Sequence, residues 1–167
     1  MSNNSSSAAS NNQISKKYNS HGRVTESVGN PAKVVMIAEK PSIAQSIAEA
    51  LSGGKHRSHK GAARSCPIYV FDGLFKGKRA TFHCTSVAGH VFNRDFPSQF
   101  SSWNIDSEKL FDAPTIRKLD KSSKPVANHL VNVSKGLDFM VLWLDCDKEG
   151  ENICFEVLDI CKKNIPK

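Results

Sequence analysis

Two short apolar runs, each followed at once by charged residues and a helix-like pattern, constrain the fold of this chain most. "KVVMIA" occupies residues 33–38 and "LDFMVLWL" occupies residues 137–144. Apolar runs of this length are typical of strands that are buried on both faces of a parallel sheet. The sequence therefore predicts an α/β fold, a parallel sheet flanked by helices, and such sheets bind ligands at the carboxyl ends of their strands.

Helical spacing follows both runs. After the first, Ser42 and Gln45 have the spacing of a capping box, and Gly53 with Gly54 ends the predicted helix. One apolar stripe recurs on each predicted helix. These stripes consist of Ile43, Ile47 and Leu51 in the first helix, and of Ile153, Cys154, Val157, Leu158 and Cys161 in the second.

The middle of the chain predicts a β-hairpin insertion. "PIYVFDGLF" and "KRATFHCTSV" flank Lys76 and Gly77, which form the expected turn, while Asp72 and Gly73 are a competing turn. Between Asp95 and Pro125, prolines, serines and lysines are mixed, which predicts loops and one or two short helices.

Composition divides the chain into two parts. Residues 1–32 are rich in serine and asparagine and predict a disordered extension, whereas residues 33–167 predict one domain. The net charge of +7 favours anionic partners, but it does not distinguish nucleic acid from an acidic membrane surface. A basic cluster either helps to bind a nucleic-acid strand or is simply solvated. It consists of Lys55, Arg57, Lys60 and Arg64.

The five cysteines are odd in number and form no CxxC pair, and the N-terminus lacks an apolar signal segment. We therefore expect a reduced, intracellular protein. Zinc binding by some of the cysteines remains an alternative, although free cysteines more often behave as small buried hydrophobic residues.

Three carboxylates follow the second apolar run at every second position. If the chain stays extended there, Asp145, Asp147 and Glu149 project to one side, where their hard oxygens suit Mg²⁺ or Ca²⁺. Glu39 and Lys40 follow the first run, and parallel strands end at the same sheet edge. Glu39 would then join the ion site or act as a general acid, while Lys40 would grip a phosphate oxygen.

Two alternatives compete with this ion site. The carboxylates can form a plain acidic turn at a helix N-terminus, which the helix dipole favours. "DCDKEGENICFE" also fits an EF-hand loop at Asp145, Asp147, Gly150 and Glu156. The β-type run before this loop argues against an EF-hand, which needs a preceding helix.

Three motifs in order, "AEKPSIAQSIA", "TSVAGHV" and "VLWLDCDKEGENICFEVLD", resemble the N-terminal Toprim domain of type IA DNA topoisomerases. The resemblance is greatest to the beta form of eukaryotic topoisomerase III and covers about residues 33–162. It implies a Toprim fold with a Mg²⁺ site. The ion ligands that it implies are Glu39, Asp145, Asp147 and Glu149.

The resemblance also implies roles for single residues. Glu39 would pass a proton to the leaving 3′ oxygen, Lys40 would stabilise the charged phosphoryl group, and His90 would contact the DNA backbone near the active site. The nucleophilic tyrosine of the family lies in a later gate domain. Neither Tyr18 nor Tyr69 has its sequence context, so we expect a fragment that carries half of an active site and is inactive alone.

The implied partners are single-stranded DNA, with RNA as a second candidate, the remaining topoisomerase domains, and a Tudor-domain protein. A nuclear location is expected, with the cytoplasm as a second candidate, and no membrane association. Two other functions stay open: a catalytically inactive module that binds nucleic acid or a partner, and a different Toprim enzyme such as a primase or nuclease.

Overall fold

The structure, a computed structural model, describes residues 17–18, 24–25, 30–100, 102 and 104–166. The chain divides into two units, residues 1–30 and residues 31–167. In the first unit, strands β1 (Lys17–Tyr18) and β2 (Val24–Thr25) pair antiparallel. The predicted disordered extension lies largely outside the described residues and stays a prediction.

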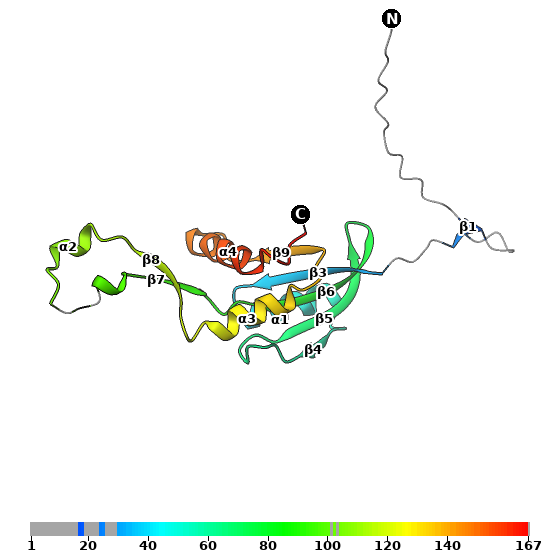
Figure 1. The fold of residues 1–167 in the computed structure, drawn as a ribbon. Coiled ribbons are helices and arrows are strands. Elements are labelled where there is room, and N and C mark those ends of the chain that lie inside the picture. The colour runs from blue at the N-terminus through cyan, green and yellow to red at the C-terminus, as the bar shows by residue number, and fades with distance from the viewer. Residues whose placement is uncertain (1–16, 19–23, 26–29, 101, 103, 167) are drawn as a thin grey trace, which may run out of the picture. The chain divides into compact units, whose positions relative to one another are not determined.

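The second unit is built on a five-stranded mixed sheet in the order β4-β5-β6-β3-β9 (Figure 1). Strand β3 (Ala32–Ala38) runs parallel to both β6 (Lys78–Ser86) and β9 (Phe139–Trp143). Strands β4 (Arg57–His59) and β5 (Ile68–Phe75) add antiparallel partners beyond β6. The predicted α/β fold is confirmed, and the predicted hairpin is the other half of the same sheet.

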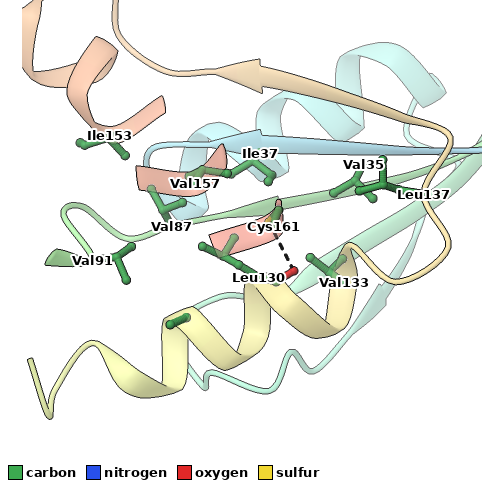
Figure 2. Close-up of a cluster of buried hydrophobic side chains, with 11 residues drawn as sticks. Val35, Ile37, Val87, Val91, Leu130, Val133, Leu137, Ile153, Val157 and Cys161 are labelled. Atoms are coloured by element: carbon green, nitrogen blue, oxygen red, sulfur yellow. Dashed lines mark hydrogen bonds between the residues drawn. The ribbon is translucent and has the colours of Figure 1, made fainter. Parts of the chain in front are cut away.

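Helices cover both faces of the sheet. Helix α1 (Pro41–Ser52) packs on the face that includes Val34 and Met36 of β3. Helices α3 (Lys124–Val133) and α4 (Lys148–Cys161) pack on the face that includes Val35 and Ile37. Figure 2 shows this second core. Adjacent β3 residues therefore face different cores, which explains why the run is apolar without alternation.

Helix α1 differs from its prediction at the start. Its N-cap is Lys40, which makes no side-chain cap, and Pro41 occupies the first turn, so the predicted capping box of Ser42 and Gln45 is wrong. Proline is favoured there because its fixed φ suits the helix and its missing N–H is not needed. The side chains fully buried on α1 are the small Ala44 and Ala48, beside the predicted stripe. The predicted end is confirmed, since Gly53 adopts a left-handed φ of 60°.

The turn between β5 and β6 is confirmed at Lys76 and Gly77, which have φ of 51° and 75°. Two consecutive positive φ values are typical of the tight turn that suits twisted hairpins. The competing turn at Asp72 and Gly73 is wrong, because both residues lie within β5.

A second hairpin was not predicted. Strands β7 (Phe92–Asp95) and β8 (Ile116–Leu119) pair antiparallel in a sheet of their own. The segment between them holds two short helices, as predicted: η1 (Ser98–Phe100) and α2 (Glu108–Phe111). Within the described residues, no helix combines the length and hydropathy that crossing a membrane would require.

Candidate functional site

The register of the parallel strands brings three segments to one edge of the sheet. Ala38, the last residue of β3, pairs with Ser86 on one side and with Trp143 on the other. Glu39 and Lys40 follow β3, the turn at 87–90 follows β6, and the acidic segment at 145–149 follows β9. The prediction that the two apolar strands end at a common edge is confirmed, and β6 adds a third segment.

The turn after β6 closes directly against the end of β3. The backbone N–H of Val87 donates to the carbonyl of Ala38 at 3.0 Å, and that of Ala88 donates to the carbonyl of Glu39 at 2.9 Å. Ala88 and Gly89 then have φ of 57° and 97°. The left-handed pair turns the chain sharply, and His90 follows it.

Glu39 and Lys40 form an ion pair at the end of β3. Lys40 Nζ lies 3.5 Å from Glu39 Oε1, and the side chain of Glu39 is only 14% exposed whereas that of Lys40 is 61% exposed. A carboxylate held at the end of a buried strand has a fixed position, while the neighbouring ammonium is open to an anionic ligand.

The acidic segment is only partly extended. Helix α4 begins at Lys148, and Asp147 is its N-cap, with Oδ1 accepting a hydrogen bond from the Gly150 N–H at 2.7 Å. Glu149 therefore lies in the first helical turn, where the helix dipole favours a negative charge. The expectation of three carboxylates along one extended face is wrong at Glu149, although all three side chains are exposed.

A glycine permits the close approach that shapes this segment. A Cβ atom at Gly150 would lie 2.1 Å from the carbonyl oxygen of Asp145. No side chain fits at that distance, so the first turn of α4 can fold back onto Asp145 only with glycine. Strand β9 precedes this loop where an EF-hand requires a helix, so the EF-hand alternative is wrong.

His90 joins the turn after β6 to helix α4. Its Nε2 lies 3.4 Å from Glu149 Oε1, and its Nδ1 lies 3.4 Å from Glu156 Oε1. The structure thus brings His90 beside one of the predicted ion ligands. Sequence reasoning gave Glu156 no role except in the EF-hand alternative. The available signal was its position three residues after Ile153 and one before Val157, on the buried side of α4.

The donor set fits a hard cation by its chemistry. Glu39, Asp145, Asp147 and Glu149 offer only carboxylate oxygens, which Mg²⁺ prefers. Across the described parts of the chain, however, no three His, Cys, Asp or Glu side chains already converge closely enough to hold an ion. The exposed Asp145 and Glu149 would have to turn inward, and the ion site stays a prediction.

The predicted basic cluster lies elsewhere. Arg57 is in β4, at the opposite side of the sheet from β9, and Lys55, Lys60 and Arg64 are exposed in the adjoining segments.

Three of the cysteines are buried, as free cysteines often are: Cys66, Cys84 and Cys161. Burial raises the pKa of the Cys84 thiol to about 12, so it stays protonated.

Comparison with known proteins gives a consistent family. The Toprim domain profile matches residues 34–167. DNA topoisomerase 3-beta of Arabidopsis thaliana is 49% identical over 133 residues, 79% of this chain and 15% of that protein. Human DNA topoisomerase 3-beta-1 is 48% identical over 128 residues, 75% of this chain and 15% of that protein. The chain therefore spans about 15% of the length of these curated relatives.

Proposed function

Because the chain belongs to the Toprim domain family, we propose that it supplies the metal-binding and acid–base part of a type IA topoisomerase. Such an enzyme changes DNA topology by breaking one strand, passing another through the break and resealing it. The observation that carries the proposal is the meeting of three strand ends at one edge. The segments that carry Glu39, Lys40, His90 and the acidic residues all end at that edge.

The proposed roles follow from the chemistry of each group. Glu39, Asp145, Asp147 and Glu149 would hold Mg²⁺, which when bound would offset the negative charge of a nucleic-acid phosphate. When it is not bound to the ion, Glu39 would pass to the leaving 3′ oxygen the proton that the attacking hydroxyl gives up as the strand is cut. The exposed Lys40 ammonium would stabilise the charge that develops on the phosphoryl oxygens.

The nucleophile would come from another domain. Tyr69 is 8% exposed within β5, and burial raises its pKa, so its phenol is a poor attacking group. The proposal therefore includes the remaining topoisomerase domains as partners.

Single-stranded DNA is the proposed substrate, with RNA as the second candidate. A Tudor-domain protein is a further proposed partner, and the nucleus is the proposed location, with the cytoplasm second.

Metal binding is the first test. Titration of the chain with Mg²⁺, followed by NMR, should show weak binding whose shifts centre on the sheet edge. The double change Asp145→Asn with Asp147→Asn should abolish it, because two anionic ligands are lost, while asparagine still caps α4. The matched control, Asp106→Asn with Asp112→Asn, removes two exposed acids elsewhere. Equal affinity in the 145/147 variant would refute the ion site.

Covalent trapping is the second test. The chain is incubated with Mg²⁺ and a 3′-labelled single-stranded oligonucleotide, and detergent stops the reaction. No labelled adduct is expected from the 167 residues alone, whereas one is expected when they replace the Toprim domain of a 3-beta relative. An adduct from the 167 residues themselves would contradict the assignment of the nucleophile to another domain.

The runner-up function is a nucleic-acid-binding module without catalysis. The exposed cations of β4 and its neighbouring segments favour it, because phosphate binding by such residues needs no metal. Salt-dependent binding of single strands that survives the loss of Asp145 and Asp147, with no trapping in the joined protein, would select this alternative.

A further inference from the structure

A buried carboxylate on α4 is not used by the proposed reaction. The side chain of Glu156 is 4% exposed. Its Oε2 accepts hydrogen bonds from the backbone N–H groups of Val91 at 2.8 Å and Phe92 at 3.3 Å. Its Oε1 lies 3.4 Å from both His90 Nδ1 and Asn152 Nδ2. Glu156 thus fixes the chain just after the turn that follows β6.

Anchoring the backbone does not explain the charge of this residue. A glutamine oxygen could accept the same bonds from Val91 and Phe92, and a buried neutral amide costs less desolvation than a buried carboxylate. The additional partners that a carboxylate can hold through Oε1 are the amide NH₂ of Asn152 and a ring N–H of His90. A carboxylate without a proton only accepts hydrogen bonds, and the contact with His90 is then a hydrogen bond in the tautomer that carries a hydrogen on Nδ1.

The orientation of the ring follows from that contact. With Nδ1 turned to Glu156, Nε2 is the nitrogen that faces Glu149, at 3.4 Å. Glu149 is exposed and belongs to the acidic segment at the sheet edge, whereas Glu156 is enclosed by α4 and the segment at 91–92. The imidazole therefore lies between the buried carboxylate and the exposed one.

We propose that Glu156 is a positioning residue for the candidate site. It holds the segment after β6 against α4 and turns the His90 ring so that Nε2 faces the acidic segment at 145–149. A carboxylate that orients a histidine in this way fixes which ring nitrogen meets the ligand. The inference rests on the proposed function, since the ligand in question is the nucleic-acid phosphate beside the acidic segment.

The direct test is NMR of the ¹⁵N-labelled histidine rings in the 167-residue chain without metal. Wild type should show a hydrogen on Nδ1 of His90. In Glu156→Gln the amide oxygen still serves Val91 and Phe92, so the amide NH₂ points at Nδ1, and the hydrogen should leave Nδ1. The matched control, Asn152→Ala, removes the other partner of Oε1 and should leave the His90 signals as in wild type.

Two results would overturn the inference. One is a wild-type His90 that carries no hydrogen on Nδ1, a result that needs no variant and so does not depend on any variant folding. The other is a folded Glu156→Gln chain whose His90 ring signals are unchanged. In that case Glu156 would only anchor the backbone.

A functional readout separates this inference from the proposed function. In the protein joined to the remaining topoisomerase domains, His90→Ala and Glu156→Gln should each reduce trapping about tenfold or more. The double variant should be no worse than His90→Ala, because both changes act through the same ring. If the Nδ1 hydrogen responds to Glu156→Gln but trapping ignores His90→Ala, the positioning stands and the proposed role of His90 fails. Additive losses would instead contradict positioning through His90.

Discussion

Two helices on the same face of the sheet each bury one polar side chain and use it to hold a neighbouring segment. On α3, His129 accepts a hydrogen bond at Nδ1 from the Ala62 N–H at 3.2 Å. Its Nε2 donates to Thr85 Oγ1 at 2.8 Å, since that hydroxyl gives its own hydrogen to the Pro67 carbonyl. On α4, Glu156 accepts from Val91 and Phe92 and reaches Glu149 through His90.

The two networks differ in where they end. That of His129 closes inside the protein: both ring nitrogens are used, and the histidine is 1% exposed. That of Glu156 opens at the sheet edge, because its last member, Glu149, is 69% exposed. A closed polar network adds rigidity and specificity to a core. An open network instead holds in place side chains that are exposed to a ligand. Mutations in the closed network should therefore change stability, and mutations in the open network should change function.

Breaking the closed network should have the largest effect. His129→Ala leaves the Ala62 N–H without its acceptor, removes the donor to the Thr85 hydroxyl, which keeps its bond to the Pro67 carbonyl, and opens a cavity in a buried site. We expect a loss of about 3–4 kcal/mol in the free energy of unfolding, measured by urea denaturation. His59→Ala, an exposed change in β4, is the control and should cost less than about 0.5 kcal/mol. If His129→Ala lost as little free energy of unfolding as the control, the His129 network would not stabilise the fold.

Filling a glycine beside His129 and a glycine in the first turn of α4 compares the two regions directly. A Cβ at Gly61 would meet the Cys66 carbonyl oxygen at 2.0 Å and His129 Cε1 at 2.5 Å, and one at Gly150 would meet the Asp145 carbonyl oxygen at 2.1 Å. Each change to alanine should destabilise the chain by about 1–3 kcal/mol. Under conditions where both variants are folded, only Gly150→Ala should weaken Mg²⁺ binding. If Gly61→Ala weakens Mg²⁺ binding equally, the stability and the Mg²⁺ binding of these two regions are not separable.

Acid should weaken the closed network. Burial lowers the pKa of His129 from its usual 6.5, so the folded protein resists a proton that the unfolded chain accepts. The stabilisation is therefore complete above pH 6.5 and is lost as the pH falls toward the lowered pKa, by at most about 1.4 kcal/mol per pH unit. Urea midpoints between about pH 7.5 and 5.5 would measure it.

The control for this pH dependence is the His129→Ala chain. Burial also lowers the pKa of His83, so the variant should keep part of the slope and lose the part due to His129. An unchanged slope would mean that protonation of His129 is not linked to folding.

The smallest effect is expected from Ser86→Ala. The Ser86 hydroxyl is the one buried side-chain polar atom in the described residues that lacks a hydrogen-bond partner. Removing an unsatisfied hydroxyl should leave the stability unchanged or raise it by up to about 1 kcal/mol, as measured by the thermal midpoint. A clear loss of stability would show that the hydroxyl makes a stabilising contact in solution.

Sequence patterns predicted the parts of the fold whose burial is continuous or whose turns need special residues. Strands β3 and β9 followed from their apolar runs, and the β5–β6 turn followed from Lys76 and Gly77. Helix α3 was missed although Ala127, Leu130 and Val133 have helical spacing, because the polar His129 shares their buried face. The β7–β8 hairpin was missed because it is short and largely exposed, so it lacks the alternation that marks a half-buried strand.

Some residues of the candidate site could likewise be predicted from the sequence, and others needed the structure. Its acidic residues were predicted because they follow strong strands, and parallel strands must end together. The helical placement of Glu149 was not predicted, because the N-cap at Asp147 starts α4 within the acidic motif. Glu156 needed the structure, since its role depends on the turn after β6, which lies more than sixty residues away in sequence.

The position of each strand in the sheet has a consequence for hydrogen exchange. Strand β3 is hydrogen-bonded along both edges, whereas β9 is the last strand of the described sheet and is bonded along one. Amide protons of β3 should therefore exchange only in global opening, and those of β9 in smaller, more frequent fluctuations. Glu39 follows the strand that should exchange slowly, and Asp145 lies beyond the strand that should exchange rapidly. On this expectation the two sides of the candidate site would part and rejoin while the centre of the sheet stays folded.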